Sequence, residues 1–313
     1  MAADRFFLLG PTASGKTAVG VELARRLEAE ILSLDSMLVY RGLDIATAKP
    51  SREEQGGVPH HLMDLVGVDQ AYSVAAYREA ALAAEAEVRA RGRRVLYVGG
   101  TTMWLRALVH GLVEVPPVPA ALEAELDARW EEDGGQVALR DELQAADPEV
   151  AARLHPHDKR RHLRALGTYL ATGRPLGAWQ GQWRDKDHAL EEPALWLDWP
   201  REQLHARLEA RLEAMEEQGL VEEVAALAAD PGFGPTAAKA IGVSAVLEHL
   251  AGDIDRAEAM RRTLKATKVL VRRQSTWLRR FPDLVRLEMR AGEPASVVAG
   301  RAAEAWAAHL ELD

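Results

Sequence analysis

The 313-residue sequence contains no cysteine, and aromatic residues make up only 5% of it. Without cysteine there can be no disulfide framework, no thiolate metal site and no cysteine nucleophile, a composition that suits the cytosol. No segment approaches the roughly 20 apolar residues that a membrane-spanning helix needs. The N-terminus has neither the basic start nor the apolar core of a signal peptide. We therefore expect a cytoplasmic protein with no membrane-embedded part.

Positive charge is also in short supply, because 39 Lys and Arg residues face 48 Asp and Glu residues, for a net charge of −9. Residues 261–280 are an exception, since they contain several cations and no acid. On a helix, cations of this segment fall within about 60° of one another. We call them the basic stripe: Arg261, Lys265, Lys268, Arg272 and Arg279. A separate apolar seam comprises Met260, Leu264, Val271 and Leu278. The pattern predicts a helix that packs on the core and offers the stripe to a polyanion.

Residues 10–17 read GPTASGKT and fit the phosphate-loop pattern G-x-x-x-x-G-K-[ST]. Gly10 and Gly15 let successive backbone N–H groups point at phosphate oxygens, and Lys16 adds a positive charge. The Thr17 hydroxyl is a candidate Mg²⁺ ligand, and the helix that follows turns its positive end to the anion. The motif predicts a polyphosphate bound with Mg²⁺, and the loop would also accept ATP.

Short apolar runs separated by helical segments fill the first third of the chain, and one more run follows at 193–200. The runs at 5–10, 29–35 and 93–100 alternate with expected helices at 15–30 and 73–92. Buried strands that alternate with helices indicate an α/β fold with a parallel sheet flanked by helices, as in P-loop kinases.

A proline-rich break at 111–120 interrupts this pattern, and residues 120–190 then read as helix almost throughout. We therefore expect a discontinuous catalytic core formed by residues 1–114 and 191–313, with an all-helical insertion domain at 115–190. Within the core, residues 201–227 and 253–281 are expected to form long helices.

Polar residues follow two of the expected strands. Asp35 and Ser36 end the second run, and Thr101 follows the third. Ligands of α/β sheets sit beyond the carboxyl ends of the strands, so Asp35 is a candidate base or Mg²⁺ ligand and Thr101 a candidate hydrogen-bonding partner of a substrate. The alternative for each is a helix cap, a common role of these residue types. RRVLYVGG ends in glycines where a P-loop ATPase usually carries an aspartate, which weighs against ATP hydrolysis.

Two further groups of arginines stand out. Arg160 and Arg164 share one helical face in the insertion, with Arg161 beside them. Arg201, Arg207 and Arg211 lie beside glutamates, a pattern typical of exposed i,i+4 ion pairs. We also count Arg207 and Arg211 as candidate diphosphate ligands.

With these motifs in place, the sequence resembles the bacterial tRNA dimethylallyltransferases nearly end to end. The resemblance rests on GPTASGKT, DSMLVYRGLDIATAKP at 35–50, GGTTMWLRAL at 99–108, HPHDKRRHLRALGTYLATGRPL at 155–176 and ATKVLVRRQSTWLR at 266–279. It implies a P-loop core whose helical insertion grips the anticodon stem-loop of tRNA. It also implies transfer of the dimethylallyl group of dimethylallyl diphosphate to N6 of adenosine 37, with Mg²⁺. We expect the protein to be a monomer.

The resemblance assigns roles by matching position. Asp35 would be the general base, Thr101 would bind the same region of the base, and Lys16 would stabilise the leaving diphosphate. The expected diphosphate-binding residues are Gly10, Pro11, Thr12, Ala13, Ser14, Gly15, Lys16, Thr17, Arg207 and Arg211. The expected tRNA contacts are Asp35, Ser36, Met37, Leu38, Thr101, Arg160, Arg161, His162, Leu163, Arg164, Lys239, Arg272, Arg273, Gln274 and Trp277. The chain departs from the family pattern at Leu38, Val243 and Glu123, where Gln, Tyr and Arg are usual.

Three other functions share parts of this pattern. A small-molecule kinase or ATPase would use the same loop but leaves the basic stripe unexplained. An isopentenyltransferase acting on free adenine nucleotides would not need the insertion. A non-enzymatic RNA-binding module would use the loop only as a switch.

Overall fold

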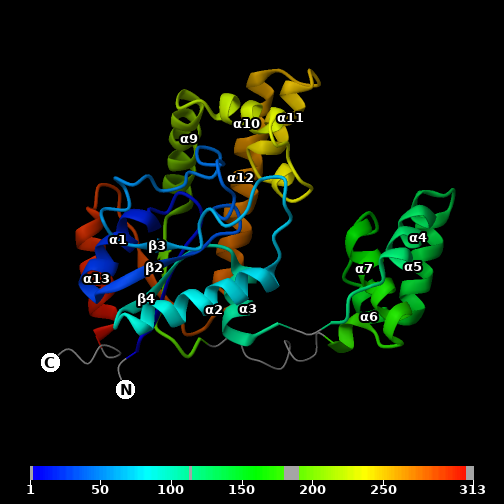
Figure 1. Ribbon diagram of the computed structural model, residues 1–313, viewed down its shortest axis with the longest axis horizontal. Coiled ribbons are helices and arrows are strands. Elements are labelled where there is room, and N and C mark those ends of the chain that lie inside the picture. The colour runs from blue at the N-terminus through cyan, green and yellow to red at the C-terminus, as the bar shows by residue number, and fades with distance from the viewer. Residues whose placement is uncertain (1–2, 113–114, 180–189, 308–313) are drawn as a thin grey trace. The chain divides into compact units, whose positions relative to one another are not determined.

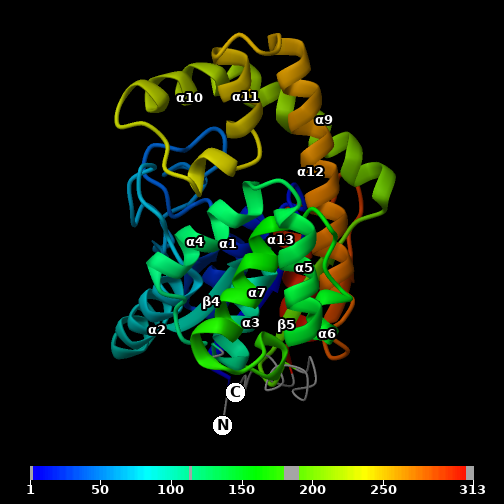
Figure 2. The same ribbon diagram turned by 90° about the vertical axis from the view of Figure 1, so that its right-hand side faces the viewer.

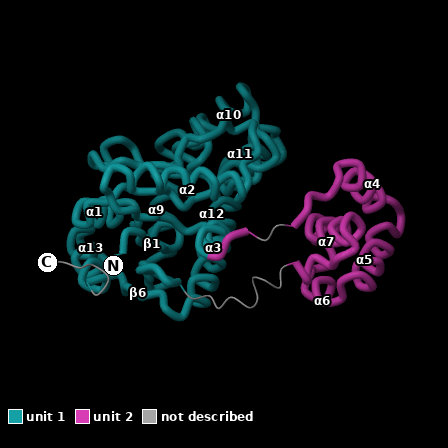
Figure 3. The backbone as a smooth tube through the Cα atoms, turned by 60° about the horizontal axis from the view of Figure 1, so that its bottom comes forward, with its two compact units in different colours: residues 1–109, 188–313 teal, residues 110–187 magenta. Residues whose placement is uncertain are grey.

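The computed structural model describes residues 3–112, 115–179 and 190–307 of the chain. The chain forms two compact units, one made of residues 1–109 and 188–313 and the other of residues 110–187 (Figure 3). The expected boundaries of the insertion were 115 and 190. In the described ranges, no helix combines the length and the apolar character that crossing a bilayer requires.

The first unit is built on a six-stranded sheet with the order β3-β2-β4-β1-β5-β6, in which every pairing is parallel. The four apolar runs form β1 (Arg5–Leu9), β2 (Ala29–Leu34), β4 (Arg94–Gly99) and β5 (Ala194–Asp198). The predicted α/β fold and parallel sheet are therefore confirmed. Two short edge strands, β3 (His60–His61) and β6 (Val285–Glu288), were not predicted.

Side chains of the central strands alternate between two apolar cores, because successive residues of a strand point to opposite faces. On one face Phe7 packs with residues of α2 (Val74–Ala90) and α3 (Thr102–His110). On the other face Phe6 packs with α1 (Lys16–Leu27) and α13 (Ala295–Ala305). The two pairs of helices are visible on opposite sides of the sheet in Figure 1. This layering leaves the carboxyl ends of the strands open for a site.

Four helices lie between β5 and β6. They are α9 (Arg201–Glu217), α10 (Leu220–Ala229), α11 (Val243–Leu250) and α12 (Arg256–Leu278), with the 3₁₀ turn η1 (Ala237–Lys239) before α11. Of these, α9 leads away from the sheet and α12 leads back to it (Figure 2). The predicted helical segment 201–227 is confirmed, but it forms two helices, α9 and α10. Gly219 adopts a φ of 99°, which ends α9 and starts α10 in a new direction. The long helix expected at 253–281 is confirmed as α12, whose start is capped by the Asp255 carboxylate.

The second unit contains α4 (Ala120–Glu131), α5 (Gly135–Ala146), α6 (Pro148–Ala151) and α7 (Lys159–Thr172), and its described residues include no strand. It has an apolar core of its own, in which Leu126, Trp130 and Leu143 are almost fully buried. The segment that we expected to be almost entirely helical is divided at Gly134 and Asp147, which cap successive helices. The part of that run at 180–189 lies outside the described residues.

Candidate active site

The phosphate loop joins β1 to α1 and has the backbone shape of an anion-binding nest. Ala13 and Gly15 both adopt left-handed conformations, with φ values of 65° and 87°. The Ser14 N–H donates to Pro11 O at 3.2 Å, which closes the turn. Alternation of left- and right-handed residues turns successive N–H groups toward one concave side. The loop therefore presents backbone donors and the N-terminus of α1 to the same point.

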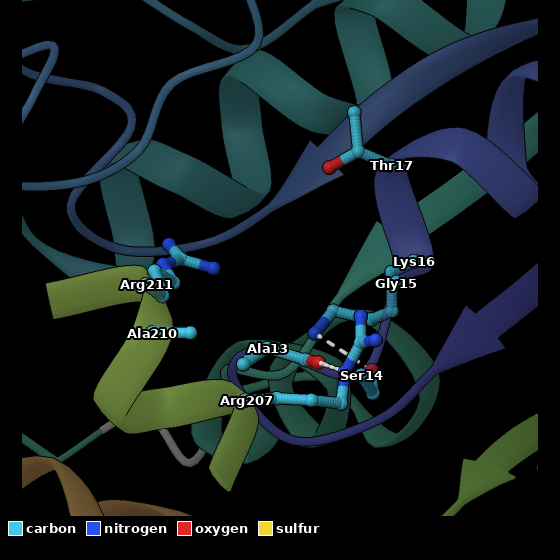
Figure 4. A pocket seen from close by; sticks show the side chains of 8 residues that line it. All are labelled: Ala13, Ser14, Gly15, Lys16, Thr17, Arg207, Ala210 and Arg211. Atoms are coloured by element: carbon cyan, nitrogen blue, oxygen red, sulfur yellow. Dashed lines mark hydrogen bonds between the residues drawn. The ribbon is translucent and has the colours of Figure 1, made fainter. Parts of the chain in front are cut away.

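Three cations surround this loop (Figure 4). Lys16 Nζ donates to Pro11 O at 2.7 Å, and Arg207 Nε donates to Ala13 O at 2.8 Å. Arg207 and Arg211 come from α9 on the opposite side of the pocket. Together with residues 13–17 they line a cavity of about 400 Å³, which we call the loop cavity. Within the described ranges neither arginine forms an ion pair with a glutamate of α9, so for these two residues the ion-pair interpretation is wrong.

Burial of these cations is unfavourable while no anion is bound. Burial lowers the pKa of the Lys16 ammonium to about 8, an effect that the nearby Asp35 carboxylate opposes and Arg211 reinforces. Burial also lowers the pKa of the Arg207 and Arg211 guanidinium groups. A polyanion in the loop cavity would offset the cost of keeping three positive charges together in a partly desolvated place.

Asp35 and Thr101 meet at the ends of β2 and β4, as the sequence predicted. The Thr101 hydroxyl accepts a hydrogen bond from Ser36 N–H at 3.1 Å, and Asp35 Oδ1 accepts one from Met37 N–H at 2.9 Å. Neither hydrogen bond caps a helix, because Asp35 closes a local turn with Met37 and Thr101 bonds to the end of the neighbouring strand. Both residues also line the same cavity, so these structural contacts are compatible with a role in substrate binding.

That cavity, the strand-end cavity, has a volume of about 500 Å³. Its wall is largely apolar, with Met37, Met215 and Trp277 among its residues, and Asp35 and Thr101 lie in it as polar groups. Arg211 lines both this cavity and the loop cavity, so the two adjoin. A ligand with an apolar chain and an anionic end can thus place one part in each. The other predicted contacts among the lining residues are Ser36, Lys239, Arg273 and Gln274.

A third cavity of about 80 Å³ adjoins both of these, with Thr17, Asp35 and Leu38 in its wall. Ser33 and His60, which the sequence analysis did not single out, also line it. Leu38 therefore faces the site at the position where the family pattern has Gln.

Gln274 bridges the phosphate loop and the end of β4. Its Oε1 accepts a hydrogen bond from Thr12 N–H at 3.1 Å, and its Nε2 donates to Gly100 O at 3.0 Å. The side chain is buried. Its amide is thus engaged by the protein itself at both ends, and the predicted contact with tRNA stays a prediction.

The basic stripe is less continuous than the sequence indicated, because acids from outside residues 261–280 approach it. Lys268 pairs with Glu209 of α9 at 2.7 Å, and Arg261 pairs with Glu258 in the first turn of α12. Lys265, Arg272 and Arg279 are exposed, and in the described part of the chain none of them has an ion-pair partner. Within the basic stripe, these three positions carry the positive charge that no acid of the described residues neutralises.

In the helical unit, the predicted contact residues lie at the start of α7, where Asp158 caps the helix. Arg160, Arg161 and Arg164 are exposed, whereas the His162 ring is buried against Trp130 at 5.6 Å. Leu163 is half-buried. The unit therefore presents the arginines to solvent and uses His162 in its own core.

The sequence analysis did not predict that Trp199 contacts the phosphate loop. Trp199 Nε1 donates to Ser14 O at 2.9 Å, and the Arg207 guanidinium lies 4.6 Å from the centre of the Trp199 ring. Trp199 directly follows β5, which pairs with β1, so sheet order brings it to the loop. No local motif marks this pairing, because it depends on which strand lies next to β1.

The model of a family described as "IPP transferase" matches residues 38–281. The tRNA dimethylallyltransferase of Thioalkalivibrio sulfidiphilus is 43% identical over 303 residues, covering 96% of this chain and 94% of that protein. That of Geobacter metallireducens is 43% identical over 281 residues, covering 89% and 90%.

Solved structures with a similar fold also include tRNA prenyltransferases. The tRNA isopentenylpyrophosphate transferase of Bacillus halodurans superposes with a TM-score of 0.70 at 30% identity, covering 98% of this chain and 97% of its own. A eukaryotic dimethylallyltransferase acting on tRNA superposes with a TM-score of 0.74 at 25% identity, covering 91% and 74%. The family match spans well over half of the chain, and the chain therefore belongs to the IPP transferase family.

Proposed function

We propose that the protein transfers the dimethylallyl group of dimethylallyl diphosphate to N6 of adenosine 37 in tRNA and releases diphosphate. The observation that carries this proposal is the junction of the two cavities. A nest with three cations opens beside a largely apolar cavity that contains Asp35 and Thr101. Such a junction suits a short prenyl chain attached to a diphosphate, with an acceptor amine beside a carboxylate.

In the proposed reaction, the N6 nitrogen attacks C1 of the dimethylallyl group. The new C–N bond forms as the C1–O bond breaks, and the diphosphate leaves with the electron pair. Asp35 orients the amine and accepts the proton that N6 loses. Thr101, whose hydroxyl already fixes Ser36, would bind the same part of the base. The adenine must leave the stack of the anticodon loop to reach Asp35, which costs least in a single-stranded loop.

Groups that line the loop cavity would stabilise the leaving diphosphate. These are the N–H groups of residues 13–17, Lys16, Arg207 and Arg211. Preorganised donors of this kind lower the barrier because they need no rearrangement as charge develops.

The residues present fit a magnesium ion bound together with the substrate. In the described ranges no group of three His, Asp or Glu side chains could hold a metal alone, but Mg²⁺ commonly binds through one or two protein oxygens and substrate phosphates. Thr17, which lines the small cavity beside the loop, would supply a hydroxyl. A bound Mg²⁺ would neutralise charge on the departing diphosphate.

For the acceptor, we propose that α12 and the helical unit bind the anticodon stem-loop through its phosphates. Exposed cations suited to this contact are Arg272 of α12, Arg279 directly after it, and Arg160, Arg161 and Arg164 of α7. We further propose that the protein works as a cytoplasmic monomer.

The test is incubation with labelled dimethylallyl diphosphate and Mg²⁺ in the presence of tRNA, AMP or ATP, followed by digestion and identification of labelled nucleosides. The proposal requires label on N6 of adenosine 37 in tRNA and none on AMP or ATP. Label on AMP would instead indicate an enzyme of free nucleotides. ATP turnover without tRNA, and no label in any arm, would indicate a kinase or ATPase.

A further inference from the structure

Residues 44–48, which we call the wall loop, form one side of the proposed active site. Ala46 and Thr47 line the strand-end cavity, and Thr47 and Ala48 line the small cavity beside Thr17 and Asp35. Thr47 O also accepts a hydrogen bond from Arg211 at 3.4 Å. A displacement of this loop would therefore change both the shape of the cavities and the position of Arg211.

One carboxylate from a distant helix holds this loop. The two oxygens of Glu223 accept hydrogen bonds from three consecutive backbone N–H groups, those of Asp44 at 2.8 Å, Ile45 at 2.7 Å and Ala46 at 2.9 Å. Glu223 lies in the first turn of α10, far from the loop in sequence. Hydrogen bonds from N–H groups to an ionised acceptor are roughly twice as strong as those between neutral groups. Consecutive N–H groups that converge on one anion also leave the loop little freedom.

The rest of the loop is tied to the core by another residue. Lys49 Nζ donates to Tyr40 O at 2.8 Å and pairs with Asp44 at 2.6 Å and Asp64 at 2.5 Å. Lys49 thus ties the Asp44 carboxylate, at the start of the loop, to Tyr40 and Asp64, whereas Glu223 holds the N–H groups of residues 44–46 from α10. The two attachments are independent because they use different atoms of the loop.

We propose that Glu223 is a positioning residue, which sets the wall loop against the substrates and so couples the α10 region to the reaction. It touches neither the loop cavity nor the strand-end cavity, and it acts through Ala46, Thr47 and Arg211. This inference rests on the proposed function for its kinetic consequence. Its structural consequence, protection of three backbone amides, does not.

The chain offers a matched control in the adjacent residue. Glu222 precedes Glu223 on α10, is exposed, and pairs with Arg256 at 3.3 Å. Removing either carboxylate changes the net charge equally, but only Glu223 touches the loop.

The first measurement is hydrogen exchange of the amides of residues 44–46 in Glu223→Ala, Glu222→Ala and the unaltered protein. We expect exchange of these amides to rise at least about tenfold in Glu223→Ala and to stay unchanged in Glu222→Ala. Unchanged exchange in Glu223→Ala would overturn the proposal whatever the activity. Should Glu223→Ala not fold, Glu223→Asp, too short to reach all three amides, and Glu223→Gln, which keeps one acceptor oxygen, are expected to give intermediate increases.

The second measurement is steady-state kinetics with dimethylallyl diphosphate and tRNA, alongside thermal unfolding. We expect kcat/KM for dimethylallyl diphosphate to fall by about 10- to 100-fold in Glu223→Ala, with a smaller fall in Glu223→Gln and no change in Glu222→Ala. The affinity for tRNA is expected to stay within twofold. If the amides of residues 44–46 exchange faster in Glu223→Ala but kcat/KM for dimethylallyl diphosphate stays normal, the positioning role is refuted. Inactivity of the unaltered protein would count against the proposed function and leave the exchange result to decide the role of Glu223.

Discussion

Replacement of Gln274 by methionine separates two roles that the sequence and the structure give this residue. The sequence places Gln274 among the tRNA contacts, whereas the structure shows its amide between Thr12 N–H and Gly100 O. Methionine has a similar length and no polar atom that could replace either hydrogen bond. The substitution therefore keeps the packing of α12 and removes the bridge between the phosphate loop and the end of β4.

The expected cost follows from these two contacts. A buried backbone group that loses its only partner costs about 1–3 kcal/mol. Thr12 and Gly100 both border the strand-end cavity, so water can compensate part of this cost at either end of the bridge. If the phosphate loop shifts to relieve that cost, about 1.5–3 kcal/mol is lost from transition-state stabilisation, or about 10- to 100-fold in kcat/KM.

The assay is steady-state kinetics with each substrate varied, together with direct measurement of tRNA binding, for Gln274→Met and for Arg272→Met on the exposed face of the same helix. We expect Gln274→Met to lower kcat/KM for dimethylallyl diphosphate and to leave the tRNA dissociation constant within twofold. Arg272→Met should raise the tRNA dissociation constant and leave kcat/KM for dimethylallyl diphosphate nearly unchanged. If Gln274→Met weakens tRNA binding as much as Arg272→Met and spares the kinetics of dimethylallyl diphosphate, the bridging role is refuted.

Two further outcomes are expected. Because burial lowers the pKa of Lys16 to about 8, its charge is present below that pH and lost as the pH rises through it. The inhibition constant of inorganic diphosphate against dimethylallyl diphosphate should therefore rise between pH 7 and pH 9.5, and a flat profile would contradict the assignment. Trp306 is 1% exposed and packs against Phe6 at 5.1 Å, so Trp306→Ala should lower the free energy of unfolding by about 3–5 kcal/mol in urea titrations. A loss below about 1 kcal/mol would show that this corner of the core is not well packed.

The parts of the fold that the sequence predicted are those with strong local patterns. The four apolar strands, the phosphate loop and α12 all have periodic or motif signals that hold without tertiary contacts. The strands β3 and β6 lack such signals, since β3 has two residues and three of the four residues of β6 are exposed. The helix break at Gly219 was not predicted, because the residues on both sides of it follow a helical pattern. The break results from the left-handed backbone conformation of Gly219.

The candidate site divides in the same way. Gly15, Lys16, Asp35 and Thr101 were found because motifs and strand ends mark them. Glu223 was not found, because its role depends on α10 reaching a loop more than 170 positions away. The ion-pair interpretation of Arg207 and Arg211 failed for a related reason, since helix spacing does not show which face turns to the phosphate loop.

The central claim is that Asp35 accepts the proton of the acceptor amine beside a diphosphate held in the phosphate loop. The most direct test is the single-turnover rate of dimethylallyl transfer to tRNA in Asp35→Asn, with the tRNA dissociation constant measured in parallel. Asparagine can still accept the hydrogen bond from Met37 N–H, so the local turn is preserved while the basic carboxylate is lost. The account predicts a rate at least about 100-fold lower with nearly unchanged tRNA binding. A near-normal rate would contradict it.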